Sequence, residues 1–171
     1  MAMGLRQAGF QHELLVECDP RCVETLERNG FLNAQCARVE DVDFTRLAGV
    51  DLVAGGVPCQ PWSRAGKNLG RDDSRNLWGQ AVRAVDECRP RTFLFENSSA
   101  MTSKRHAPYL AELVSQFEAL GYNVAICCVN AADYGVPQNR RRLLLIGTKE
   151  GVYIPPTPIA PQITVRQALA S

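Results

Sequence analysis

The sequence has few of the residues that build metal centres and crosslinked frameworks. It contains only two histidines, and none of its seven cysteines stands in a CxxC pair. An odd cysteine count without such pairs argues against a disulfide framework and gives no indication of a zinc site. Cys18 and Cys22 can share a helix face, but further ligands of a closed site are not visible. We therefore expect no resident metal.

Long apolar runs and a strong net charge are also absent. No run of eighteen or more apolar residues occurs, and the N-terminal MAMGLRQAGF lacks the apolar centre of a secretory signal. We therefore expect neither membrane spanning nor export, and we place the protein in the cytoplasm. The formal net charge of +1 neither requires nor excludes a nucleic-acid partner. With 171 residues, 46% of them hydrophobic, the chain is long enough for one domain with a core.

Strand-like and helix-like segments alternate along most of the chain. Asp19 as N-cap, Pro20 at the first helical position and Gly30 beyond the end mark one helix. Apolar spacing predicts further helices over 77–88 and 109–120. Strands are expected over 13–17, 51–55, 92–95, 124–129 and 142–147. This order predicts an α/β doubly wound, mostly parallel sheet, whose last two strands form an antiparallel pair at one edge.

The amino-acid composition changes after residue 150. Four prolines stand between Pro155 and Pro161, which no sheet accommodates, so an extended connector is expected. The closing ITVRQALAS is typical of the beginning of a helix. We divide the chain into a core over 1–150 and a proline-rich connector over 151–171.

The segment DLVAGGVPCQPWS at 51–63 presents one cysteine between two prolines. The paired glycines permit a tight exit from the predicted strand, and Pro58 and Pro61 restrict the backbone around Cys59. Because chemistry collects at the carboxyl ends of parallel strands, Cys59 is a candidate nucleophile. A buried, inert cysteine is the alternative.

Other reactive side chains follow other predicted strands. Glu17 ends the first strand, Glu96 and Asn97 follow the segment 92–95, and Arg140 and Arg142 precede or begin the last strand. These positions predict a thiol, a carboxylate and guanidinium groups on one rim of the sheet.

At this point the chain resembles the cytosine-C5 DNA methyltransferases of bacterial type. The resemblance rests on four motifs in the family's order: GGVPCQPWSRAGK, DDSRNLW, FLFENSSAM and NAADYGVPQNRRRLLLIG. It implies a Rossmann-like S-adenosylmethionine-dependent methyltransferase fold, S-adenosylmethionine as cofactor and double-stranded DNA as partner. It also implies a link to restriction-modification, and methyl transfer to C5 of cytosine through a covalent adduct of Cys59 at C6.

The resemblance assigns roles to the residues of the rim. Glu96 would hold the N3 edge of the cytosine, and Asn97 would order the turn. Arg140 and Arg142 would contact the O2 edge and a phosphate, and strand alternation places both on one face. Arg141 is expected to point the other way.

The resemblance also assigns the cofactor and the DNA contacts. Glu17 would bind the ribose hydroxyls, and Asp41 with Val42 the adenine, whereas Pro58 and Leu77 would line the pocket. In the loop that follows Cys59, contacts to DNA are expected from Gln60, Ser63, Arg64 and Lys67.

Two segments typical of the family do not appear. The first strand with its glycine-rich turn is apparently missing, as is a target-recognition domain, so we expect missing flanking segments or a complementing subunit. The leading reading is a catalytic core; the alternatives are a non-catalytic remnant or interaction subunit, and a methyltransferase acting on tRNA cytosine.

Overall fold

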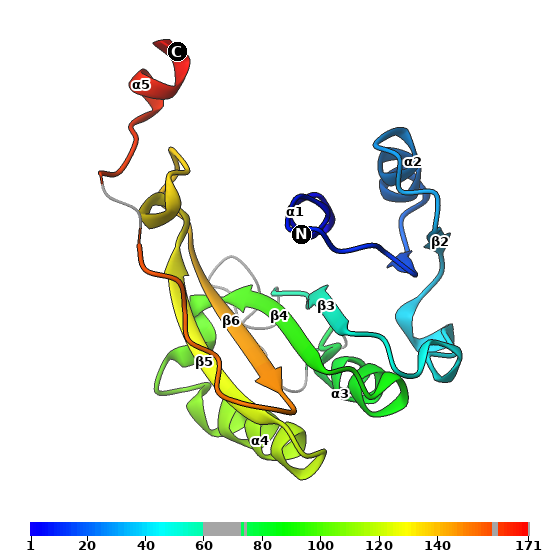
Figure 1. The fold of residues 1–171 in the computed structure, drawn as a ribbon. Helices are drawn as coiled ribbons and strands as arrows, with labels where there is room; N and C mark the ends of the chain where they lie inside the picture. Colours follow the sequence, from blue (N-terminus) through cyan, green and yellow to red (C-terminus); the bar gives the residue numbers. More distant parts are fainter. Residues whose placement is uncertain (60–72, 74, 159–160, 171) are drawn as a thin grey trace.

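The computed structural model describes residues 1–59, 73, 75–158 and 161–170. In this part of the chain a four-stranded sheet has the order β3-β4-β6-β5 (Figure 1). Strands β3 and β4 are parallel, and β6 is antiparallel to both of its neighbours. A separate pair, β1-β2, is parallel. The strands are β1 (Leu15–Glu17), β2 (Ala34–Cys36), β3 (Leu52–Gly56), β4 (Thr92–Ser98), β5 (Asn123–Asn130) and β6 (Arg141–Thr148).

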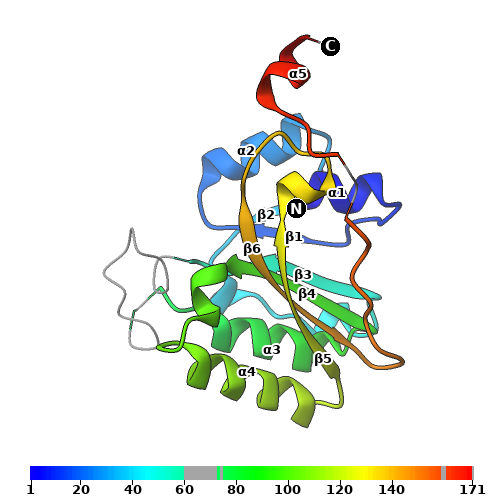
Figure 2. The same ribbon diagram turned by 90° about the vertical axis from the view of Figure 1, so that its left-hand side faces the viewer.

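Helices α3 and α4 cover one face of the four-stranded sheet, whereas α1 and α2 lie with the β1-β2 pair (Figure 2). Short 3-10 turns connect several elements. The helices are α1 (Ala2–Gln7), α2 (Pro20–Arg28), α3 (Trp78–Cys88), α4 (Ala107–Ala119) and α5 (Val165–Ala170). The fold is the expected α/β arrangement, and α5 begins within the closing segment.

The core lies between the four-stranded sheet and α3 and α4. Along β4 burial alternates, with Phe93, Phe95 and Asn97 buried, so the side chains between them lie on the opposite face. The ring centroids of Phe93 and Phe117 of α4 are 4.3 Å apart. Trp78 of α3 packs edge-on against Phe95 with centroids 5.9 Å apart. These aromatic contacts fix the two helices beneath β4.

The predicted start of α2 is confirmed. The side chain of Asp19 accepts a hydrogen bond of 2.9 Å from the backbone N–H of Arg21, and Pro20 is the first helical residue. The segments 2–7 and 34–36 were not expected to be regular, yet they form α1 and β2. Their six and three residues are too short to show a clear apolar period.

The antiparallel pair predicted for the last two strands at one edge of the sheet is confirmed. β5 is the outermost strand on that side, and β6 joins it to β4. The run RRLLLIGT contains Leu143, Leu145 and Ile146 as buried residues. Such a near-continuous apolar run is typical of a strand with neighbours on both sides.

A wide space separates the two sheets. A cavity of about 2330 Å³ is lined by residues 14–17, which include β1, and by residues 51–56, which include β3, but by none of β2. β1 therefore faces β3 across the cavity, and neither strand has a described partner on that side. Neighbouring strands normally lie about 4.8 Å apart. β1 and β3 therefore belong to separate sheets within the described residues.

We expect residues 1–171 alone to self-associate. Two strand edges with unpaired backbone groups flank the cavity, and apolar side chains such as Leu14, Leu15 and Leu52 line it. Sedimentation velocity is expected to show oligomers, and a dye that binds exposed apolar surface is expected to fluoresce. A monomer with a cooperative melt at high temperature and no dye binding would contradict this expectation.

Candidate active site

The chain leaves β3 at Gly56 and enters a short loop that presents Cys59. Val57 is buried, Pro58 is half-buried and Cys59 is exposed. The side-chain amide of Asn97, which is 1% exposed, donates a hydrogen bond of 3.1 Å to the carbonyl oxygen of Val57. Because an unpaired buried amide is costly, this bond fixes the start of the loop against β4. Cys59 is thus not the buried thiol of the alternative interpretation.

Glu96 lies on β4 beside the end of β3. Its partner in the parallel register is Gly56, three residues before Cys59. Because Phe95 and Asn97 point into the core, Glu96 projects from the other face of the sheet. A Cβ atom placed on Gly56 would lie 3.8 Å from Glu96 Oε2, so the carboxylate reaches the strand that carries the thiol loop. The predicted convergence of carboxylate and thiol segment on one rim agrees with this register.

Two arginines approach the carboxylate of Glu96. Arg142 Nε lies 2.6 Å from Glu96 Oε1, and Arg140 Nη2 lies 3.8 Å from the same oxygen. Both side chains remain partly exposed, at 31% for Arg142 and 48% for Arg140, so they are also accessible to an anion. Their common partner shows that the two arginines share a face, as strand alternation predicts. Arg141, between them, is exposed.

The sequence does not single out Asn130, the last residue of β5. Its Oδ1 accepts a hydrogen bond of 2.9 Å from the backbone N–H of Arg140. The carbonyl of Arg140 in turn accepts one of 3.0 Å from Ala131. These bonds hold the backbone of Arg140 in place before β6 begins. An asparagine at a strand end followed by a turn is the signal that points to such a role.

Three of the five residues expected to bind the cofactor line the cavity described above: Glu17, Pro58 and Leu77. Asp41 is exposed on the turn Val39–Asp41 and does not line it, although its neighbour Glu40 does. Val42 is 3% exposed and packs with Phe44 in the core. The structure therefore brings the first three together around one space and places the other two beside it.

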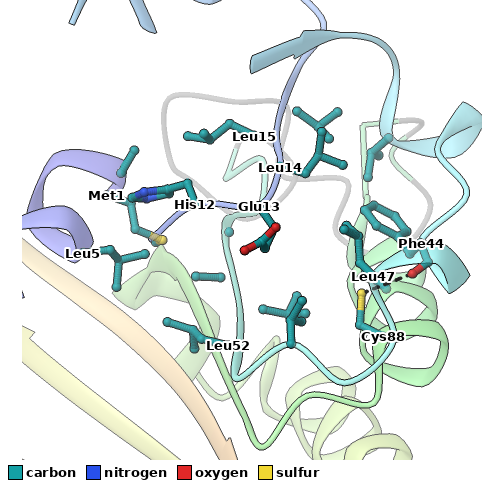
Figure 3. Close-up of a pocket in the computed structure, with 18 of the residues that line it drawn as sticks. Met1, Leu5, His12, Glu13, Leu14, Leu15, Phe44, Leu47, Leu52 and Cys88 are labelled. Atoms are coloured by element: carbon teal, nitrogen blue, oxygen red, sulfur yellow. Dashed lines mark hydrogen bonds between the residues drawn. The ribbon is translucent and has the colours of Figure 1, made fainter. Parts of the chain in front are cut away.

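The side chains of Glu17, Pro58 and Leu77 in the cavity fit S-adenosylmethionine. Glu17 is the last residue of β1, where a carboxylate can accept hydrogen bonds from ribose hydroxyls. Pro58 and Leu77 provide apolar contacts on the opposite wall. Ligand pockets usually measure about 300–1,000 Å³, so this cavity is larger than the cofactor requires. Figure 3 shows apolar side chains, including Leu14, Leu15 and Leu52, in the part between the sheets.

The segment before α3 is anchored by Asp73, a residue within the DDSRNLW motif. Asp73 is 5% exposed. Arg75 binds both of its carboxylate oxygens, with distances of 2.8 Å from Nε and 2.6 Å from Nη2. The side-chain amide of Asn76 donates to the hydroxyl of Tyr109 on α4 at 3.0 Å. This motif therefore fixes the entry into α3, which carries Leu77 at its N-cap.

The four residues expected to contact DNA, Gln60, Ser63, Arg64 and Lys67, lie outside the described residues. Within the described part of the chain, no cluster of histidine, cysteine or carboxylate side chains could hold a metal ion. None of the described helices has the length and apolarity needed to cross a membrane.

Comparison with known proteins shows which family the sequence of this chain matches. The model of the C-5 cytosine-specific DNA methylase family matches residues 1–168. The type II methyltransferase M.NgoMIV of Neisseria gonorrhoeae is 39% identical over 149 residues, which are 86% of this chain and 48% of that protein. M.PspPI of Psychrobacter sp. (strain TA137) is 40% identical over 178 residues, covering 99% and 43%. The chain thus spans about half or less of the length of these relatives.

The fold of this chain is also similar to a solved structure. A crystal structure of a candidate DNA modification methyltransferase encoded within a prophage of E. coli aligns with a TM-score of 0.77 at 26% identity. The alignment covers 95% of this chain and 49% of the other.

Proposed function

The chain belongs to the C-5 cytosine-specific DNA methylase family, and on that premise we propose that it forms the base-binding and cofactor-binding core of an enzyme that methylates C5 of cytosine in DNA. The observation that carries the proposal is the ion pair between Glu96 and Arg142. Glu96 pairs in register with Gly56, which stands three residues before the exposed Cys59. A thiol, a carboxylate and two guanidinium groups on one rim of the sheet suit a reaction on a polar aromatic ring.

The residue types match the chemical problem. Cytosine C5 is a weak nucleophile until a thiolate adds to C6, and we assign this addition to Cys59. The resulting enamine would form a bond from C5 to the methyl carbon as the bond between that carbon and the cofactor's sulfur breaks and S-adenosylhomocysteine leaves. Water acting as a base would then take the C5 proton, and elimination of the thiolate from C6 would restore the ring. S-adenosylmethionine supplies the electrophilic methyl group. We assign its ribose hydroxyls to Glu17 and its adenine to Asp41 and Val42. We assign its methionine part to the wall around Pro58 and Leu77.

Glu96 and the arginines would orient the base. In this assignment the carboxyl group of Glu96 holds the N3 edge, while Arg140 and Arg142 donate to the O2 edge and to a neighbouring phosphate. The pairing of Arg142 with Glu96 keeps both side chains in place before the base arrives. A base within a duplex must leave the stack to reach Cys59, which costs about a few kcal/mol. We assign contacts with the opened duplex to Gln60, Ser63, Arg64 and Lys67. Such an enzyme would act in the cytoplasm, beside bacterial DNA.

The proposal is tested by covalent trapping. Duplex DNA containing 5-fluorocytosine is incubated with residues 1–171 and S-adenosylmethionine, because fluorine at C5 prevents the proton loss that releases the thiolate. The expected result is a protein–DNA complex that survives denaturation and depends on the cofactor. Its absence, with DNA containing unmodified cytosine also left unmethylated, would contradict catalysis by this chain.

The cavity between β1 and β3 favours a second candidate, an interaction subunit of a split methyltransferase. Two facing strand edges offer a place for a segment from a complementing subunit. Trapping that appears only after a partner is added would support this candidate. A tRNA containing 5-fluorocytidine, used in parallel, tests the alternative that the chain is a methyltransferase acting on tRNA cytosine. Preferential trapping on this RNA would indicate that RNA, not DNA, is the substrate.

A further inference from the structure

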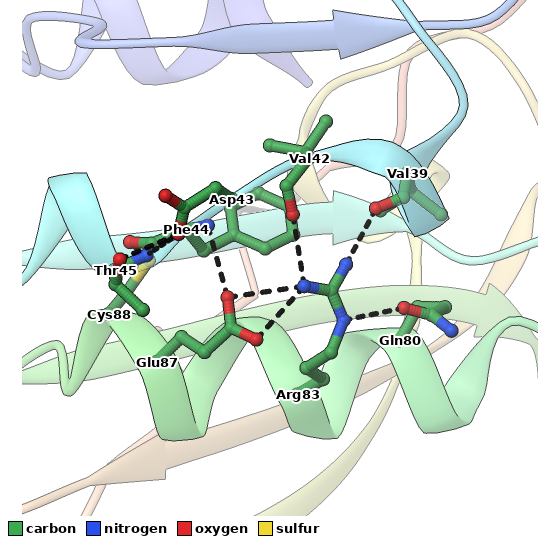
Figure 4. A network of polar contacts seen from close by, with 9 residues as sticks. All are labelled: Val39, Val42, Asp43, Phe44, Thr45, Gln80, Arg83, Glu87 and Cys88. Atoms are coloured by element: carbon green, nitrogen blue, oxygen red, sulfur yellow. Dashed lines mark hydrogen bonds and ion pairs between the residues drawn. The ribbon is translucent and has the colours of Figure 1, made fainter.

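All three guanidinium nitrogens of Arg83 on α3 donate hydrogen bonds, and two of them bind carbonyls of a neighbouring turn (Figure 4). Nη2 donates to the carbonyl of Val39 at 2.7 Å, and Nη1 donates to the carbonyl of Val42 at 2.9 Å. Nε donates to Oε1 of Gln80, one helical turn earlier, at 2.7 Å. A planar fork with several donors suits this task, whereas a lysine has a single ammonium group.

The two carbonyls bracket the 3-10 turn Val39–Asp41. Glu87, one turn further along α3, accepts from Arg83 Nη1 at 3.0 Å and from the backbone N–H of Phe44 at 3.0 Å. Three backbone groups of the segment 39–44 are therefore tied to one helix. These side chains are shielded, with Arg83 30% and Glu87 24% exposed, so the contacts are stronger than those of a fully solvated pair.

The same turn forms part of the cavity wall. Val39 and Glu40 line the cavity together with Glu17, and Gln80 lines it from α3. The chain reaches the turn directly from the end of β2, where Cys36 pairs in register with Glu17. Arg83 itself does not line the cavity. It can therefore affect a ligand there only through the groups that it holds, which are the turn and the side chain of Gln80.

We propose that Arg83 is a positioning residue for S-adenosylmethionine, which fixes the turn 39–42 at the rim where the nucleoside binds. The proposal rests on the function proposed above. It gives a reason for the arginine of α3 that donates to two backbone carbonyls: the turn has only three residues of its own to define its shape. Without the guanidinium group of Arg83, Glu40 and Asp41 would no longer be held at a fixed distance from Glu17.

The test measures binding of S-adenosylhomocysteine to residues 1–171 by calorimetry, in the wild type and in R83M, R83K and R28M. Arg28 is the matched control, since it also pairs with a glutamate one turn away on its helix but is 76% exposed and outside the cavity wall. We expect at least a tenfold higher Kd for R83M, a severalfold higher Kd for R83K, and no change for R28M. Hydrogen exchange is expected to accelerate at amides 39–44 in R83M and R83K.

A kinetic measurement separates positioning from general damage. In the trapping reaction, the concentration of S-adenosylmethionine at half-maximal rate should rise at least tenfold for R83M, while the rate at saturation changes by less than twofold. If the wild type binds S-adenosylhomocysteine and folded R83M binds it with the same Kd, the inference about Arg83 is overturned, whereas the proposed cofactor site is not. Absence of binding by the wild type would overturn it together with the proposed cofactor site. If R83M does not fold, an R83K protein with wild-type Kd overturns the inference.

Discussion

Replacing Cys59 by serine, C59S, is expected to abolish covalent trapping on 5-fluorocytosine DNA and to lower methyl transfer by a factor on the order of 10⁴ or more. A serine hydroxyl occupies the same exposed place in the loop, but at neutral pH it is a far weaker nucleophile than a thiol. The Asn97–Val57 hydrogen bond that fixes the loop does not involve the thiol, so the fold should be unaffected. The measurement is the fraction of DNA retained with the protein after denaturation.

C22S provides the control for this experiment. Cys22 is also an exposed free cysteine, but it lies on α2 and not in the cavity wall. The C22S protein is expected to be trapped like the wild type. An adduct that persists in C59S, or one lost equally in C22S, would show that Cys59 is not the nucleophile.

The substitution G147A is expected to destabilise the protein by about 3 kcal/mol or more, at the upper end of the cost of overpacking a core. A Cβ atom on Gly147 of β6 would lie 2.7 Å from Cδ1 of Phe93 and closer still to Cε1 and Cζ. Phe93 cannot move away, because it is fully buried and packs against Phe117 and Tyr122. The midpoint of urea denaturation is expected to fall accordingly.

G79A is the matched control, because a Cβ on Gly79 of α3 meets no atom within 4 Å. Alanine in a helix is expected to change the free energy of unfolding by a few tenths to about 1 kcal/mol in the stabilising direction. The double variant G147A/F93L should be less destabilised than the sum of its single changes, since leucine leaves room for the new methyl group. Equal stability of G147A and the wild type would contradict the packing described here.

Much of the fold was predictable because local patterns and tertiary structure agree. Helix α2 begins where Asp19 and Pro20 predict, and the apolar segments 92–95 and 142–147 lie within strands. The order of these elements indicated an α/β sheet. Segment 34–36 escaped prediction because β2 is only three residues long and is defined by its pairing with β1.

Part of the candidate site was also visible in the sequence, namely the residue types at strand ends. Their roles in the reaction remain predictions. The sequence signals a turn at Asn130 but not its bond to Arg140. The contacts of Arg83 could not be foreseen, because they reach backbone groups whose positions no sequence pattern records. In the same way, the central place of β6 depends on its pairing with β4 across more than forty residues of chain.

The sequence by itself determined the family, the alternation of elements and the chemical groups of the rim, since these follow from residue identity and short-range spacing. Only the tertiary structure decided that Glu96 pairs with Arg142, that Asp41 and Val42 stand beside the cavity rather than in its wall, and that β1 faces β3 without pairing with it. These are long-range facts, because they depend on strand register and on which elements pack together.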